Sequence, residues 1–168
     1  MIKVARPLVT VVIPTYNHAQ YLRRALSSVV NQTYVNWEAI VIDNHSTDNT
    51  DEVMENFIRP NIVYLKIHNN GVIAVSRNAG IREARGDWIA FLDSDDWWEN
   101  NKLSESVKYI QLGNDIVYHP LKIVNKSNNI FIPKSTSTMG FDKDIYSNLI
   151  EFGNFIPNSS VVVKKHFL

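Results

Sequence analysis

The chain alternates between short apolar runs and stretches of helical periodicity. Four runs rich in β-branched residues predict strands buried on both faces, at 8–13, 38–42, 62–67 and 87–92. The first is followed by Leu22, Ala25, Leu26, Val29 and Val30, whose spacing of i, i+3, i+4, i+7 and i+8 is typical of one face of a helix. Three more helices are predicted, at 47–58, at 72–85 and around Leu103, Val107 and Ile110.

Punctuating residues give these elements their expected ends. Pro60 closes the helix at 47–58, which opens in a segment rich in N-cap residues and acids. Gly86 follows the helix at 72–85 and is expected to be its C-terminal stop.

Strands that alternate with helices predict an α/β fold with a mostly parallel sheet, helices covering both of its faces. After Asn114 the pattern becomes α+β in character. There we expect a strand at 115–124, a turn at 127–129, a short strand at 130–132, a loop at 134–140, a helix at 144–152 and a strand at 159–164. We interpret 1–168 as a single domain whose ligand-binding part spans 8–113, followed by a smaller, partial region at 114–168.

Composition excludes several classes of protein. With 17 Lys and Arg against 17 Asp and Glu, the chain lacks the basic excess that nonspecific nucleic-acid binding needs, so no nucleic-acid partner is expected. The absence of cysteine excludes disulfides, zinc–thiolate sites and cysteine nucleophiles. No apolar run approaches a membrane span, and the first residues lack the features of a signal peptide, so we expect a cytoplasmic protein.

Polar residues follow each of the four predicted strands, at 14–17, 43–46, 68–71 and 93–96. In an open parallel sheet, ligands bind outside the carboxyl ends of the strands, so these segments should meet at one edge. The last segment carries Asp93, Asp95 and Asp96, whose mutual repulsion a hard divalent cation would relieve. The alternative is a solvated acidic turn that caps the next helix, although a position after a buried strand favours the metal.

The other candidates each have an ordinary structural alternative. Tyr16 is either a ring that stacks on a base or sugar, or an ordinary aromatic residue at the edge of the core. Asp43 and Asn44 suit hydrogen bonds to a base or ribose, or simple turn chemistry. Arg77 and Arg82 either face a diphosphate or belong to a solvated face of their helix. The five histidines show no metal-ligand spacing and receive no role.

Taken together, these motifs form an ordered series. It reads VVIPTYN at 11–17, SSVVNQT at 27–33, VIDNHSTD at 41–48, NG at 70–71, SRNAG at 76–80, GDWIAFLDSDD at 86–96 and KL at 102–103. The series resembles that of the family 2 glycosyltransferases, which have the GT-A fold, a Rossmann-like sheet flanked by helices. The resemblance is strong over about the first 110 residues and weak afterwards.

The resemblance implies roles for the matched positions. Pro14, Thr15 and Tyr16 would line the nucleotide pocket, Asp43 and Asn44 would contact the base, Arg77 would lie near the phosphates, and Ser94 would belong to the same nucleotide-sugar site. Asp93 would face the ribose and the metal, and Asp95 would be the main ligand of Mn²⁺ or Mg²⁺.

The implied reaction is transfer of a sugar from a nucleotide-diphosphate donor, commonly a UDP-sugar, to a saccharide or glycoconjugate acceptor, with inversion. Polysaccharide assembly is the expected setting, and peripheral association of a longer enzyme with a membrane is left open. Charge developing on the diphosphate leaving group calls for a Lewis acid, and the attacking hydroxyl calls for a general base.

Two positions depart from the family pattern. Asn44 stands where many relatives carry an aspartate, and no acidic pair follows the strand at 159–163. The usual general base is therefore expected beyond Leu168. Asp142, Asp144 and Glu151 are the late carboxylates within the chain, and they are better interpreted as exposed charges.

The alternative function is therefore a truncated or non-catalytic domain that binds a nucleotide-sugar and a metal without transfer. A doubly wound phosphoacceptor signalling domain is a third possibility, since it too gathers carboxylates at strand ends around magnesium. It would not explain the segments at 14–17 and 93–95 together.

Overall fold

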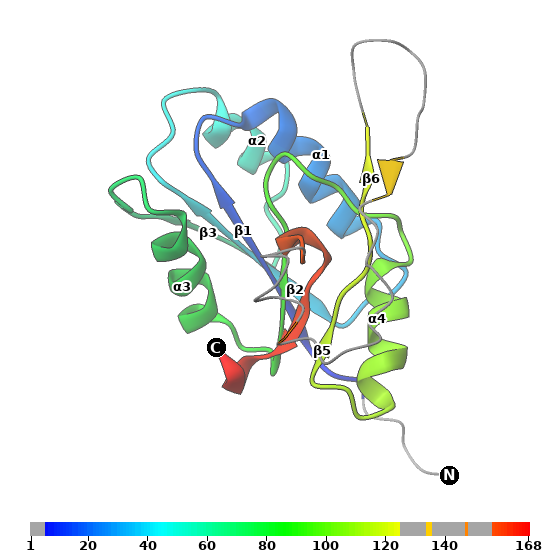
Figure 1. Cartoon of the computed structure of the whole chain (residues 1–168). Helices are drawn as coiled ribbons and strands as arrows, with labels where there is room; N and C mark the ends of the chain where they lie inside the picture. The colour runs from blue at the N-terminus through cyan, green and yellow to red at the C-terminus, as the bar shows by residue number, and fades with distance from the viewer. Residues whose placement is uncertain (1–5, 125–133, 136–146, 148–155) are drawn as a thin grey trace.

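A six-stranded mixed sheet forms the centre of the protein, in a computed structural model that describes residues 6–124, 134–135, 147 and 156–168 (Figure 1). The strand order is β3-β2-β1-β4-β8-β5. The parallel strands are β1 (Val9–Thr15), β2 (Trp37–Asp43), β3 (Ile62–Lys66) and β4 (Trp88–Phe91). They are extended by β8 (Val162–Lys164), which is antiparallel to both β4 and β5 (Ile116–Val117).

Helices cover both faces of this sheet (Figure 1). One face carries α1 (Ala19–Val30), α2 (Thr50–Glu55) and α4 (Lys102–Gln111), and the other carries α3 (Ile73–Glu83). Two 3₁₀ turns, η1 (Asn158–Ser160) and η2 (Lys165–Phe167), flank β8. A separate two-stranded ladder pairs β6 (Lys122–Ile123) with β7 (Lys134–Ser135).

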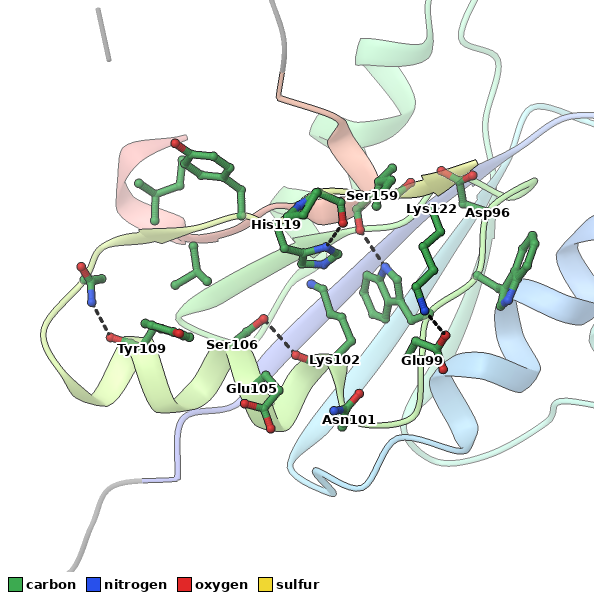
Figure 2. Close-up of a pocket in the computed structure, with 18 of the residues that line it drawn as sticks. Asp96, Glu99, Asn101, Lys102, Glu105, Ser106, Tyr109, His119, Lys122 and Ser159 are labelled. Atoms are coloured by element: carbon green, nitrogen blue, oxygen red, sulfur yellow. Dashed lines mark hydrogen bonds and ion pairs between the residues drawn. The ribbon is translucent and has the colours of Figure 1, made fainter. Parts of the chain in front are cut away.

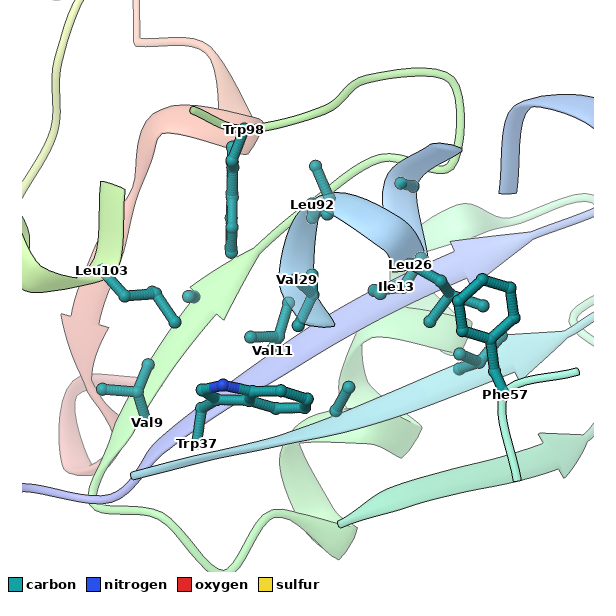
Figure 3. Packing of buried hydrophobic residues seen from close by; sticks show 14 of the residues in the cluster. Val9, Val11, Ile13, Leu26, Val29, Trp37, Phe57, Leu92, Trp98 and Leu103 are labelled. Carbon is teal, nitrogen blue, oxygen red and sulfur yellow. The ribbon is translucent and has the colours of Figure 1, made fainter. Parts of the chain in front are cut away.

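The core consists of two apolar layers, one on each face of the sheet. Side chains alternate along a strand, so Val9, Val11 and Ile13 of β1 enter the layer under α1, α2 and α4, whereas Val12 faces α3. The first layer is the larger and includes the aromatic rings of Trp37 and Trp98 (Figure 3). Burial on both faces explains why these strands have continuous apolar sequences.

The α/β fold and the four parallel strands predicted from the sequence are confirmed, and the four helices predicted before residue 114 are present. The second helix is shorter than 47–58, because Asp48 accepts hydrogen bonds in the preceding turn and the helix begins only at Thr50.

Several expectations for the last third were wrong in detail. The expected strand at 115–124 is two short strands interrupted at 118–121, where Pro120 removes a backbone donor. Lys134 and Ser135, expected in a loop, pair with β6. The expected strand at 159–164 begins as a 3₁₀ turn and becomes a strand only at Val162. The elements expected at 127–129 and 130–132, and all of 144–152 except Ser147, lie outside the described residues.

Gly86 does not stop α3 as the sequence suggested. The helix ends where Ala84 adopts an extended conformation, with φ −62° and ψ 129°. A Cβ on Gly86 would lie 2.6 Å from the Leu8 carbonyl oxygen and 2.7 Å from Thr10 Oγ1. Gly86 is therefore needed for the close approach of two backbone segments at the amino-terminal end of β1.

We expect Gly86→Ala to destabilise the fold by roughly 1–3 kcal/mol, because the added methyl group meets backbone that must shift. Urea unfolding measures the change. The control is Asp87→Ala, which alters an exposed neighbouring side chain and should change the free energy of unfolding by less than about 0.5 kcal/mol. Equal stability of Gly86→Ala and the wild type would contradict this account.

Candidate functional site

The loops after β1 and β2 are joined by reciprocal hydrogen bonds. The backbone N–H of Asn17 donates to Ser46 Oγ at 2.9 Å, and the backbone N–H of Thr47 donates to Asn17 Oδ1 at 2.8 Å. Asn17 has φ 51°, a left-handed conformation that asparagine tolerates better than most residues. Asn17 therefore fixes the separation of two loops that lie far apart in the sequence.

Asp48 joins the same two loops from the other side. Its carboxylate accepts from the backbone N–H of Ala19 at 2.9 Å, at the start of α1, and from the Thr50 backbone N–H at 3.1 Å. Partial desolvation raises the pKa of Asp48, but the Thr50 hydroxyl and these N–H groups outweigh it and hold the pKa below its ordinary value. One side chain thus caps a helix on a different segment of the chain.

Further contacts bring in the loops after β3 and β4. Asn44 Oδ1 accepts from the backbone N–H of Asn69 at 2.9 Å, and His18 Nδ1 lies 3.1 Å from Ser94 Oγ. The ends of all four parallel strands therefore lie at one edge of the sheet.

The acidic cluster lies at the end of β4 on this edge. Asp95 is exposed and Asp93 partly exposed. The Arg77 guanidinium donates to Asp93 Oδ1 at 2.7 Å, while Arg77 Nε is buried without a hydrogen-bond partner. Asp96 is half-buried, and burial, followed by the Asp95 and Asp93 charges, raises its pKa against the opposing effects of Ser159 and Arg24.

These carboxylates fit a divalent cation as a partial ligand set. Within the described ranges, no three His, Asp or Glu side chains gather as a complete metal site. Magnesium and manganese commonly take one or two carboxylates and complete their coordination with waters and substrate phosphates. Exposed Asp95 and partly exposed Asp93 suit that arrangement.

Asp43 and Asn44 lie at the end of β2 and are engaged within the protein. Asp43 is fully buried, and its oxygens accept from the Ser46 backbone N–H at 3.0 Å and from the Tyr64 hydroxyl at 2.9 Å. Burial first, and then hydrogen bonds to Asp51 and Asp43, raise the pKa of Tyr64. Turn chemistry thus accounts for much of the environment of Asp43, and a contact with a base stays a prediction.

The segment after β1 is divided between interior and surface. Pro14 and Thr15 are buried, and Thr15 Oγ1 has no hydrogen-bond partner. Tyr16 is 53% exposed. Its ring is therefore available for stacking, the role that the resemblance gives it.

Two features of this edge were missed in the sequence. The rings of His45 and His68 stack at 3.9 Å with an interplanar angle of 18°. The Arg24 guanidinium lies 3.6 Å from the centroid of the Trp97 ring and donates to the Asp95 carbonyl oxygen at 3.1 Å. Both histidines follow predicted strands, so the strand-end rule would have found them. Arg24 lies within α1 and gave no such signal.

Comparison with known families agrees with this geometry. The model of the family described as Glycosyl transferase family 2 matches residues 10–166. The chain belongs to this family. It spans about half the length of the curated relatives that it matches, for example 42% and 52% of two of them.

Individual relatives give the same assignment. The Escherichia coli protein named UDP-Glc:alpha-D-GlcNAc-diphosphoundecaprenol beta-1,3-glucosyltransferase WfgD is 37% identical over 128 residues, which cover 76% of this chain and 50% of that protein. Among solved structures, Staphylococcus aureus TarS 1-349 in complex with UDP gives a TM-score of 0.75 at 24% identity, covering 95% of this chain and 47% of that one. The likeness to TarS shows the GT-A fold.

A third similar structure was solved with a metal. Mannosyltransferase PcManGT from Pyrobaculum calidifontis, in complex with GDP-Man and Mn²⁺, gives a TM-score of 0.59 at 26% identity and covers 73% of this chain and 36% of that one. Among the residues that our structure describes, no helix is both long and apolar enough to cross a membrane.

We expect Asp48→Asn to lower the stability at pH 7 by about 1 kcal/mol, as for the loss of a helix cap. The pKa of Asp48 is lowered in the folded state, so its contribution is present above the unfolded value of about 4 and is lost as the pH falls through the folded value. Thermal unfolding of mutant and wild type should therefore converge in acid.

The control is Glu52→Gln, which changes an exposed carboxyl group on α2. A mutant as stable as the wild type at pH 7, or a difference that persists unchanged well below pH 4, would contradict the capping role of Asp48.

Proposed function

We propose that this glycosyltransferase uses a nucleotide-diphosphate sugar, with a UDP-sugar as the first candidate, and transfers the sugar to a saccharide or glycoconjugate hydroxyl with inversion. The observation that carries the proposal is the pair of Asp93 with the Arg77 guanidinium, next to the exposed Asp95 at the end of β4. Carboxylates and a guanidinium at one edge of a parallel sheet suit a metal–diphosphate group. The donors in the printed names of similar proteins, UDP-Glc and GDP-Man, support this class.

In the proposed mechanism, Asp95 and Asp93 hold Mn²⁺ or Mg²⁺. A bound divalent ion supplies Lewis-acid stabilisation to a diphosphate leaving group. Arg77 keeps Asp93 in place through the hydrogen bond of its guanidinium. Tyr16, exposed after β1, offers a stacking face to the base.

Other parts of the donor site stay predictions. Pro14, Thr15 and Ser94 are proposed to shape the nucleotide pocket, and Asp43 and Asn44 to face the base. Cytoplasmic location and peripheral association with a membrane are likewise predictions from the sequence.

Calorimetric titration of the chain with UDP, with and without Mn²⁺, tests the donor site. Binding should require Mn²⁺, and Asp95→Asn should weaken it at least tenfold because the main metal ligand loses its charge. Asp87→Asn is the matched control, since Asp87 is exposed at the opposite end of β4. Unchanged affinity in Asp95→Asn would contradict the proposed metal–diphosphate site.

A transfer assay with a UDP-sugar and a saccharide acceptor separates the two candidate functions. Mn²⁺-dependent binding with turnover supports a transferase in the chain as it stands. Binding without turnover favours a domain that binds the nucleotide-sugar without transferring the sugar.

A further inference from the structure

A cavity of about 740 Å³ lies between α4, the segment after β4 and the segment at 116–124. Its size falls within the range of about 300–1,000 Å³ that is usual for small-molecule sites. Aromatic residues, including Trp98, Tyr109 and Tyr118, line it together with polar groups (Figure 2). Flat apolar rings beside a few polar groups are suited to a saccharide.

Lys102 lies in the wall of this cavity without a partner. Its side chain rises from the first turn of α4 towards His119 (Figure 2), and the residue is only 6% exposed. Its Nζ has no hydrogen-bond partner and lies 4.1 Å from the centroid of the Trp98 ring. A buried ammonium group without a counter-ion is costly to the folded state, and the Trp98 ring offsets only part of this cost, so a negatively charged ligand would stabilise the ammonium further.

His119 supplies a second unpaired nitrogen to the same space. Its Nδ1 lies 3.0 Å from the Pro120 carbonyl oxygen and so carries the proton that it donates there. This leaves Nε2, which is buried and has no hydrogen-bond partner. In the neutral ring Nε2 is therefore an acceptor, which suits the hydroxyl of a saccharide.

The carboxylates around the cavity do not neutralise Lys102. The charged residues in its lining besides Lys102 and His119 are Asp96, Glu99, Glu105 and Lys122. Glu105 accepts from Lys108 at 2.7 Å, and Glu99 lies 3.5 Å from Lys122. Within the described part of the chain, Lys102 takes part in no ion pair.

The cavity shares a wall with the acidic loop of the donor site. Asp96 and Ser159 both line it. Ser159 Oγ accepts from the Asp93 backbone N–H at 3.0 Å, so this wall is continuous with the proposed metal ligands. A saccharide in the cavity would therefore lie next to the donor diphosphate.

We propose that this cavity binds an acceptor saccharide whose anionic group, a carboxylate or a phosphate, contacts Lys102 while one of its hydroxyls donates to His119 Nε2. The proposal rests on the proposed transferase function and specifies its acceptor class. Burial and the Lys102 charge lower the pKa of His119, which favours its neutral form. Burial also lowers the pKa of Lys102 to about 7, so the charge of this amine sets the pH dependence. The preference for an anion should therefore be strongest near pH 6 and fade as the pH rises above 7.

The test measures binding of three small probes to the chain at pH 6, in the presence of UDP and Mn²⁺, by NMR titration. Methyl glucuronide carries a carboxylate, N-acetylglucosamine 1-phosphate carries a phosphate, and methyl glucoside is neutral. At least one anionic probe should bind tenfold or more tightly than methyl glucoside. The probe that binds more tightly shows whether the cavity prefers a carboxylate or a phosphate.

Lys102→Met should abolish this preference, and Arg59→Met, which removes an exposed cation outside the cavity lining, should retain it. Affinity for UDP with Mn²⁺ should be the same in the wild type and both variants. A protein that does not bind UDP contradicts the proposed donor site, and this result is distinct from the loss of anion preference. The proposal is overturned if neither anion is preferred, if both variants lose the preference equally, or if UDP competes with the anionic probe.

Unfolding experiments show whether Lys102→Met loses anion binding merely because the variant is less stably folded. The folded pKa of Lys102, about 7, lies below its model value of 10.5. The unfolded chain therefore binds more protons between these values, and wild-type stability should rise with pH across this window. Lys102→Met should be more thermostable than the wild type at pH 6, with the difference shrinking towards pH 10. A Lys102→Met variant that is less stable at pH 6 would contradict the unpaired state of the amine.

Discussion

The site depends on one constraint, which is that four loops must be held together at the carboxyl edge of the parallel sheet. The strands alone bring the loops to the same edge. Side chains then fix them, chiefly Asn17 and Asp48 between the first two loops and Asn44 between the second and third. These three contacts use backbone N–H groups as donors, so a polar loop becomes ordered without a hydrophobic core of its own. Arg77 adds the acidic end of β4 to this network.

Much of the fold could be predicted from local sequence because the central strands are buried on both faces. The continuous run of β-branched residues in β1, which includes Val9, Val11 and Val12, favours a strand that is buried on both faces. The last third resisted prediction for a physical reason. The strand β8 pairs with β4 and β5, so its register is set by contacts such as Val162 with Ala90 that no local pattern encodes. Gly86 was misjudged similarly, since its neighbour Leu8 is distant in sequence.

The strand-end rule correctly predicted that the segments after the four parallel strands meet at one edge, but it did not predict the contacts that these segments make. Asp43 was recognised, but its partner Tyr64 extends from the neighbouring strand, and the sequence does not reveal that pairing. Lys102 was recognised only as part of the KL motif at 102–103, and nothing in the sequence indicated that its side chain is buried. Its burial against Trp98 depends on how α4 packs beside β5. Sequence patterns therefore identify chemistry at strand ends better than chemistry enclosed between packed elements.

The central claim is that a metal-bound donor occupies the edge where these loops meet. Paramagnetic broadening of amide resonances by Mn²⁺, added together with UDP, tests it most directly. The account predicts the strongest broadening at residues 93–96 and clear broadening at 15–18 and 43–46, with the amino-terminal ends of the same strands unaffected. Broadening centred elsewhere, or confined to 93–96 without the other two loops, would contradict a single shared site.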